Sequence, residues 1–280
     1  MKHCNERSVK YVFCFFFCFM AISSCTKDKP DESEIQEIGV GLFDVIEYYY
    51  KLTTTKVDGK FIFESNLCDN EPSNSNIVTA GGAFYDKQGN IVNNGGTVVI
   101  GTMTVPNHNG TFYIEKAVSQ NGLYGTNVKF TIQSPPDILT GTQAADATAS
   151  IYSPLPINIT NIQPGTKLLL KANMSTSLTW NADPANSNGV VIMAEYIPSR
   201  SPNRNIASGG ATGLIQHSQL VPDNGSYSIP WSFFSDYPPG GHVILWIARG
   251  NYAIASTSVY NYKVGGYTAA GIWDVIVPPR

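Results

Sequence analysis

The chain has 280 residues, of which 42% are hydrophobic, 14% charged and 11% aromatic. The charged fraction is well below the ~25% of ordinary soluble domains, which argues against helical bundles and coiled coils. The hydrophobic fraction is too high for a disordered chain. The formal net charge of -3 provides no basic field that would attract nucleic acid, so no nucleic-acid partner is expected.

The first 24 residues have the features of an export signal. Lys2, Arg7 and Lys10 form a basic start, and an unbroken apolar run follows over residues 11–22. This run is shorter than the ~20 residues that cross a membrane as a helix. We therefore expect residues 1–24 to be a signal peptide.

The signal ends in Ile22, Ser23, Ser24 and Cys25, which resembles the lipobox of bacterial lipoproteins. In that family the cysteine sulfur receives a diacylglycerol and the peptidase cuts just before it. The resemblance therefore implies that Cys25 is lipidated and that the protein lies at the outer membrane or cell surface. Two alternatives stay open: an ordinary secretory signal that leaves Cys25 unmodified, and an uncleaved anchor.

Residues 25–38 read as an acidic tether. The stretch after Cys25 partly resembles the export signal of surface lipoproteins in Bacteroidota, although Lys29 interrupts its acidic residues; a simple solvated tether is the other interpretation. The signal holds three of the 18 basic and one of the 21 acidic residues, which leaves 15 and 20 and a net charge of -5. An acidic body does not bind an anionic membrane by charge, so the acyl chains are the expected membrane contact.

Cysteine usage indicates a domain without disulfides. Cys4, Cys14 and Cys18 leave with the signal and lipidation uses Cys25, so Cys68 has no intrachain partner. The mature chain must then be stable through its hydrophobic core alone, for which it is long enough.

The remaining sequence predicts an all-β protein. Asn-Gly, Asp-Gly and Gly-Gly turn signals recur between short β-branched and aromatic runs, a spacing typical of sandwiches. Prolines at positions 154 and 156 predict a boundary, so we expect two consecutive β-sandwich modules, residues 39–153 and 154–280. The strand ending in Trp180 is similar to the Trp strand of immunoglobulin-like sandwiches, without their partner cysteines.

Three local predictions accompany this fold. The run over residues 38–55 is ambiguous, and we favour a strand that forms a hairpin with residues 60–64 across Asp58-Gly59. Gly250-Asn251 and Gly265-Gly266 are interpreted as turns. The segment 242–248 is apolar on both faces, which predicts a central strand.

No catalytic constellation is evident. The mature histidines (His108, His217, His242) lack metal-ligand spacing, so no metal and no cofactor are expected. Several scattered acids could serve a glycosidase only if the fold paired them: Glu115, Asp183, Glu195, Asp236 and Asp274. The oxygen-rich loop at residues 181–188 weakly suggests calcium, although turns are the commoner reason for such loops.

The aromatic residues offer the remaining candidate site. Flat rings beside Asn or Asp side chains suit a sugar, whose C–H face stacks on the ring while polar groups take its hydroxyls. Four aromatic residues are the candidates for ligand binding: Trp231, Tyr237, Tyr252 and Trp273. Trp180 and Trp246 are expected in the core.

Three functions follow as hypotheses. The first is a non-enzymatic surface lipoprotein for binding or adhesion, with glycans or another cell-surface polymer as partner. The second is a fimbrial or other structural assembly subunit. The third is a polysaccharide-acting hydrolase, which requires two acids in one cleft above an aromatic floor.

Overall fold

The computed structural model describes residues 48–49, 57–67, 77–92, 96–117, 122–133, 145–163, 166–197 and 216–279. Over these residues the protein is all-β, with several sheets consistent with the expected β-sandwich modules. The immunoglobulin-like detail stays a prediction. The strands are β1 (Gly59–Leu67), β2 (Ile77–Phe84), β3 (Thr97–Ile100), β4 (Met103–Val105), β5 (Asn107–His108), β6 (Thr111–Ala117), β7 (Thr126–Gln133), β8 (Ala147–Ser153), β9 (Leu168–Leu169), β10 (Thr176–Thr179), β11 (Val190–Tyr196), β12 (Gln216–Val221), β13 (Ser226–Ile229), β14 (His242–Ser256) and β15 (Asn261–Ile276).

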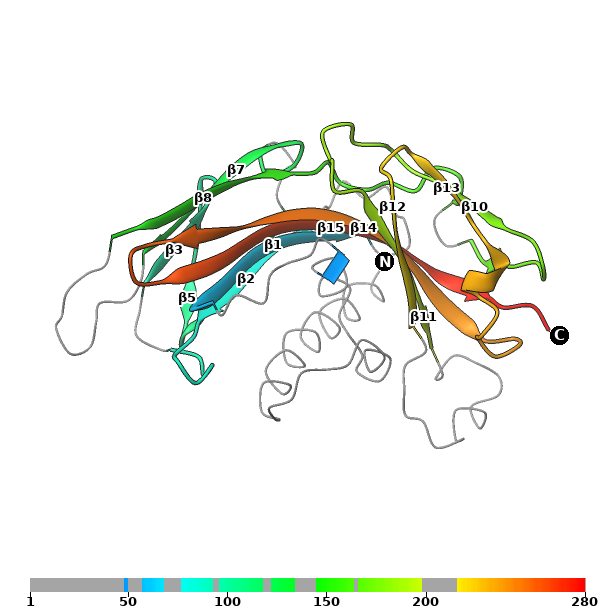
Figure 1. The fold of residues 1–280 in the computed structure, drawn as a ribbon, viewed down its shortest axis with the longest axis horizontal. Coiled ribbons are helices and arrows are strands. Elements are labelled where there is room, and N and C mark those ends of the chain that lie inside the picture. Colours follow the sequence, from blue (N-terminus) through cyan, green and yellow to red (C-terminus); the bar gives the residue numbers. More distant parts are fainter. Residues whose placement is uncertain are drawn as a thin grey trace.

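One large sheet is the central element of the fold. It has nine strands, eight of them in the order β12-β11-β14-β15-β1-β2-β6-β5, with β9 paired to β15. A four-stranded sheet, β4-β3-β7-β8, and a two-stranded sheet, β10-β13, complete the fold. Figure 1 shows β7 and β8 over one end of the large sheet and β10 and β13 over the other end, both on the same side. The result is two sandwiches built on one sheet.

The hairpin of β14 and β15 passes through both sandwiches. Ala255, Tyr262 and Val264 lie in the first core, together with residues of β1 to β8. Leu245 and Ile272, from the other half of the same two strands, lie in the second core. The segments 39–153 and 154–280 therefore contribute to one common sheet.

The central-strand prediction is confirmed. β14 is hydrogen-bonded to β11 on one side and to β15 on the other, and Val243, Ile244, Leu245 and Ala248 are all buried. One face of the large sheet, the core face, covers the two sandwich cores. The opposite face, called here the second face, carries its own buried cluster, which consists of Val191, Met193, Ala248, Tyr267 and Ala269.

Two turn predictions are wrong. Gly250-Asn251 lies inside β14 and Gly265-Gly266 lies inside β15. The glycines serve close packing: a Cβ on Gly250 or Gly265 would meet the Tyr267 ring at 2.2 or 2.8 Å. By contrast, Asn109 and Gly110 have φ values of 54° and 89° and join β5 to β6, as the Asn-Gly signal predicts.

The strand expected over residues 38–55 is contradicted where the structure describes it, because Tyr48 and Tyr49 are helical. The proposed hairpin across Asp58-Gly59 is also wrong. β1 pairs in parallel with β15 on one side and antiparallel with β2 on the other. β15 and β2 thus occupy both edges of β1, which leaves no edge for the expected partner strand. No helix within the described part of the chain is long and apolar enough to cross a membrane.

Candidate functional site

The four aromatic candidates do not form one site. Trp231 begins a short 3-10 helix (Trp231–Phe233) and packs, partly buried, against the second core. Tyr237, expected to be exposed on a turn, is 1% exposed and belongs to the same core. The turn after Tyr237 carries its ring inward, because the side chain has a polar partner inside the sheet.

The Tyr237 hydroxyl contacts both strands of the ladder between β11 and β12. Ala194 and His217 lie opposite each other in these strands. The hydroxyl donates to the Ala194 carbonyl at 2.7 Å and accepts from the His217 backbone N–H at 3.1 Å. It therefore satisfies two backbone groups that face each other across the ladder, and burial raises the pKa of this phenol. Tyr237 is a structural residue.

Tyr252 and Trp273 lie on the second face but far apart. Both are partly buried. Tyr252 is on β14 opposite Gly265, whereas Trp273 contacts Trp246 near the other end of the hairpin. Six residues separate Trp246 and Tyr252 along an extended strand, which corresponds to about 20 Å. Trp273 thus has Trp246 as an aromatic neighbour on this face.

Trp246, expected in the core, is the main aromatic group of this surface. It is only partly buried, and its indole lies over Gly271 of β15, where a Cβ would come within 2.8 Å of the ring. The Trp273 ring stands at 70° to it, with 5.6 Å between centroids. The two indoles thus form a partly exposed aromatic pair on the second face of the sheet.

A carboxyl group completes this surface. Glu195 of β11 is on the same face as Met193, which lies directly opposite Trp246. The Trp246 side chain hydrogen-bonds the Glu195 carboxyl; burial raises the pKa of Glu195, and this bond opposes the rise. Trp246, Trp273 and Glu195 are called here the tryptophan corner.

A β-bulge adds a second carboxyl next to the corner. The register between β14 and β15 shifts at Val243–Leu245, so that Trp273 and Asp274 both lie opposite Ile244. A bulge lets consecutive side chains share one face of a sheet. Asp274 is 39% exposed, and one of its carboxyl oxygens lies 3.6 Å from Nδ1 of His242.

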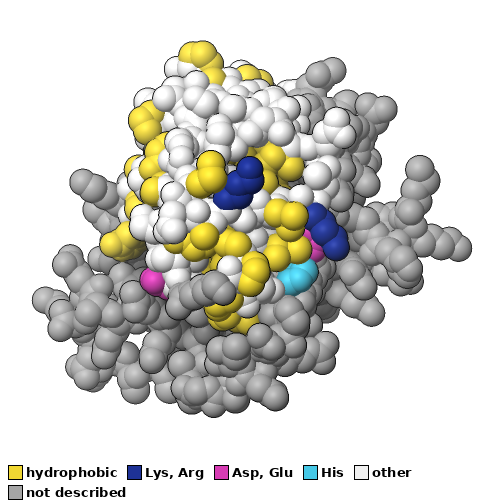
Figure 2. Space-filling view, turned by 90° about the vertical axis from the view of Figure 1, so that its right-hand side faces the viewer, with side chains coloured by type: hydrophobic (Ala, Val, Ile, Leu, Met, Phe, Trp, Pro, Cys, Tyr) yellow, Lys and Arg dark blue, Asp and Glu magenta, His cyan; other side chains and the backbone are white. Residues whose placement is uncertain are grey.

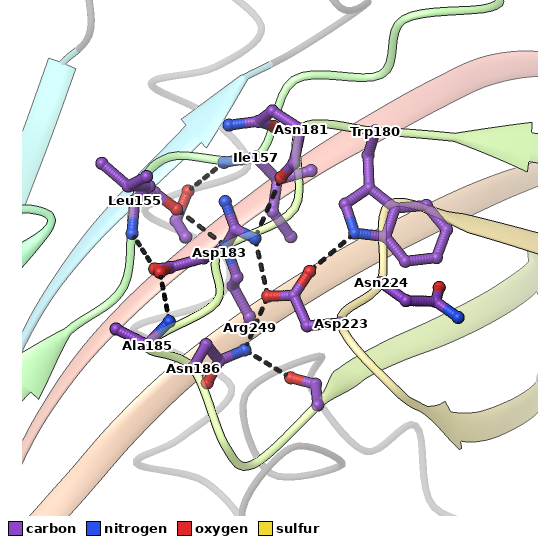
Figure 3. A network of polar contacts seen from close by, with 12 residues as sticks. Leu155, Ile157, Trp180, Asn181, Asp183, Ala185, Asn186, Asp223, Asn224 and Arg249 are labelled. Carbon is purple, nitrogen blue, oxygen red and sulfur yellow. Dashed lines mark hydrogen bonds and ion pairs between the residues drawn. The ribbon is translucent and has the colours of Figure 1, made fainter.

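A second polar cluster lies on the core face, between the two sandwiches (Figure 3). Its centre is Arg249 of β14, which is 0% exposed. The guanidinium contacts the Asp223 carboxylate at 2.7 Å and donates to the backbone carbonyls of Leu155, Pro156 and Asn181. The chain passes from the first sandwich to the second at Leu155 and Pro156. Arg249 therefore holds this connecting segment against the sheet.

The other oxygen of Asp223 is also occupied. The Trp180 indole N–H donates to it at 2.8 Å, and the Asn186 amide donates to the oxygen that contacts Arg249. Trp180 is 4% exposed, so it lies in the core as predicted. A charged pair that is buried, hydrogen-bonded and paired in this way is typical of a structural element.

The loop that weakly suggested calcium is organised by hydrogen bonds. The Asp183 oxygens accept from the Tyr152 hydroxyl and from the backbone N–H groups of Leu155 and Ala185. The Asn181 side chain bridges Asn158 and Pro156. These donors occupy the side-chain oxygens of Asp183 and Asn181, and the described residues contain no group of three His, Cys, Asp or Glu that could hold a metal.

The surface near the second sandwich carries few charges. Figure 2 shows that end of the molecule, where several hydrophobic side chains and a few Lys, Arg, Asp, Glu and His side chains are visible among the described residues. Cys25, the tether and Cys68 lie outside the described residues.

Comparisons with known proteins identify no family. Neither a family model nor a curated protein matches the chain.

The sequence contains a signal that could have located the tryptophan corner. Trp246 and Gly271 lie opposite each other in one long hairpin, but the reading of Gly265-Gly266 as a turn hid that pairing. The central position of Trp246 in an apolar run also favoured a buried ring over a surface one.

Proposed function

We propose that the protein is a lipid-anchored outer-membrane or cell-surface module that binds glycans without catalysing a reaction. The observation that carries the proposal is the tryptophan corner, in which the partly exposed Trp246 ring packs on Gly271 beside Trp273. A pyranose ring stacks its C–H face on such a surface, because both partners are flat and apolar there.

Polar groups beside the rings support a sugar over a purely apolar ligand. Glu195 offers carboxylate oxygens to sugar hydroxyls, and its contact with Trp246 fixes its position relative to the ring. Asp274 and His242 lie on the same face next to Trp273. A few polar groups around an aromatic floor give orientation and specificity.

The anchor is the second part of the proposal, and it depends on Cys25. A diacylated Cys25 would hold the body at the membrane, since each buried CH₂ contributes ~0.8 kcal/mol. Mass spectrometry of the protein from its native host tests this step. An unmodified thiol at Cys25 would remove the anchor and leave the binding proposal standing.

Binding is tested with the full-length mature protein on an array of neutral and acidic oligosaccharides, followed by calorimetry with cellohexaose, mannohexaose and N-acetylchitohexaose. Trp246→Ala and Trp273→Ala should each weaken binding about tenfold or more, because each removes a stacking ring. Trp231→Phe is the matched control, since Trp231 is also partly buried but packs against the second core. Absence of any bound glycan, or equal losses in all three variants, would refute the proposal.

A specific observation also favours polysaccharide hydrolysis as a second candidate. Glu195 and Asp274 flank Ile244 from β11 and β15, the two neighbours of β14. Neighbouring strands are ~4.8 Å apart, so their backbones are about 10 Å apart, within the range from which two carboxyl groups can act on one bond. The release of reducing ends from a bound hexaose, lost in Glu195→Gln, would establish this activity; an intact hexaose after long incubation would exclude it.

A further inference from the structure

Tyr49 is held on the second face by its hydroxyl group. The hydroxyl donates to the Ser218 backbone carbonyl at 2.7 Å and lies 3.2 Å from the Ser218 side-chain oxygen. The ring packs against the second-face cluster, and Trp246 packs against the same cluster. Tyr49 is thus a fixed neighbour of the tryptophan corner.

The sheet register gives the spacing between the two. Ser218 of β12 lies opposite Met193 of β11, and Met193 lies opposite Trp246 of β14. The three residues form one row across the sheet, with ~4.8 Å between strands. The point at which Tyr49 is anchored is therefore about 10 Å from the strand position of Trp246.

The Ser218 carbonyl that Tyr49 binds points outward from β12, on the side of this strand that is opposite to β11. His217 and Ala194 direct their backbone groups toward each other, since both contact the Tyr237 hydroxyl between the strands. Backbone groups alternate along a strand, so those of Ser218 point outward from β12. The Tyr49 hydroxyl occupies one of these outward groups, which places the ring at the β12 border of the second face.

We propose that Tyr49 is a specificity-determining residue of the glycan site: it forms the wall across the sheet from Trp273 and contacts sugar units beyond the one stacked on Trp246. This inference depends on the proposed glycan-binding function. The Ser218 bond holds the ring in place before the ligand arrives, so little side-chain entropy is lost on binding. Long neutral oligosaccharides are the ligand class that such a wall favours.

Calorimetry with cellobiose and cellohexaose, mannobiose and mannohexaose, and the N-acetylchito-oligosaccharides of the same lengths tests the inference on the full-length mature protein. Tyr49→Ala should weaken hexaose binding about tenfold and leave disaccharide binding within about twofold, because only the longer chain reaches the wall. Tyr49→Phe, which keeps the ring and loses the bond to Ser218, should cost about two- to threefold for the hexaose. Tyr227→Ala is the control, since Tyr227 is also partly buried but packs against the second core, on the opposite face of the sheet.

The outcomes separate the two proposals. If the wild-type protein binds hexaose and disaccharide, and Tyr49→Ala weakens both equally or neither, the role of Tyr49 is refuted while the glycan function stands. If the wild-type protein binds none of the six sugars, the glycan function fails and the role of Tyr49 fails with it. Unchanged affinity in Tyr49→Phe, together with a tenfold loss in Tyr49→Ala, would support the wall and refute the positioning by Ser218.

Discussion

The two faces of the large sheet treat buried charge differently. On the core face, Asp223 lies 2.7 Å from Arg249, and both of its oxygens accept further hydrogen bonds. On the second face, burial raises the pKa of Glu64 to about 7 and also raises the pKa of Glu195. On the core face, a cation and hydrogen-bond donors compensate the buried charge of Asp223, as in a structural cluster. The second face instead keeps carboxyl groups in an environment that disfavours their charge. Such environments are more frequent at functional sites.

The same residue types therefore have two roles in one protein. Trp180 with Asp223 and Asn186 forms a closed structural cluster, while Trp246 with Trp273 and Glu195 forms an accessible one. What separates them is exposure and the partners of the carboxyl group, which a pattern of residue types does not show.

The largest effect on stability is expected when the cluster around Arg249 on the core face is disrupted. Arg249→Ala leaves Asp223 buried without its cation, so the free energy of unfolding should fall by about 3–5 kcal/mol. Urea denaturation measures the loss. The double variant Arg249→Met with Asp223→Leu should recover a large part of it, because no buried charge remains. A loss of less than about 1 kcal/mol in Arg249→Ala would contradict the scaffold role.

The next effect concerns Glu64 on the second face. Its folded pKa of about 7 is above the ordinary 4.5, so the folded protein binds this proton more tightly than the unfolded chain. The free energy of unfolding should therefore fall as the pH rises from about 4.5 to about 7 and then level off. We expect the fall to be about 2 kcal/mol, less than full burial would give because Glu64 keeps some exposure and Lys60 partly offsets the effect.

Glu64→Gln should remove this dependence and stabilise the protein at pH 8, as measured by urea denaturation across the pH range. Asp236→Asn serves as the control, because the Asp236 side chain is 68% exposed. An unchanged pH profile in Glu64→Gln would show that the second face does not disfavour the charge.

The smallest effect on stability is expected from removing the Tyr237 hydroxyl, which contacts both β11 and β12. Tyr237→Phe leaves the Ala194 carbonyl and the His217 N–H without their shared partner, so we expect a loss of about 1–2 kcal/mol in the free energy of unfolding. Thermal denaturation followed by circular dichroism measures it. Tyr227→Phe is the control, since Tyr227 is only partly buried at the edge of the second core. A variant as stable as the wild type would mean that the two strands close directly on each other.

The all-β class could be predicted from the sequence because turn and strand signals are local. The pairing of strands could not, because it depends on contacts between distant segments. β1 pairs with β15, and Gly59 lies opposite Tyr262. Glycines illustrate the limit: Asn109-Gly110 makes a turn, whereas Gly265-Gly266 lies extended under aromatic rings, and the dipeptides alone do not distinguish the two cases.

The candidate site was predicted only in part. Trp273 was identified because it stands beside an acid, and it lies in the tryptophan corner. Trp246 was assigned to the core, since an apolar run on both faces is typical of burial, yet its side chain lies on the second face of the sheet and is only partly buried. Tyr237 was expected at the surface because prolines and glycines follow it, and its hydrogen bonds inside the ladder explain the opposite outcome.

The long hairpin that serves both sandwiches also sets the order in which the chain can fold. Phe61 packs on Tyr262, with 6.2 Å between ring centroids. The first core therefore needs Tyr262, which follows Phe61 by about two hundred residues in the chain. Contacts of such long range form slowly. The first core therefore cannot be completed before β15 has been synthesised.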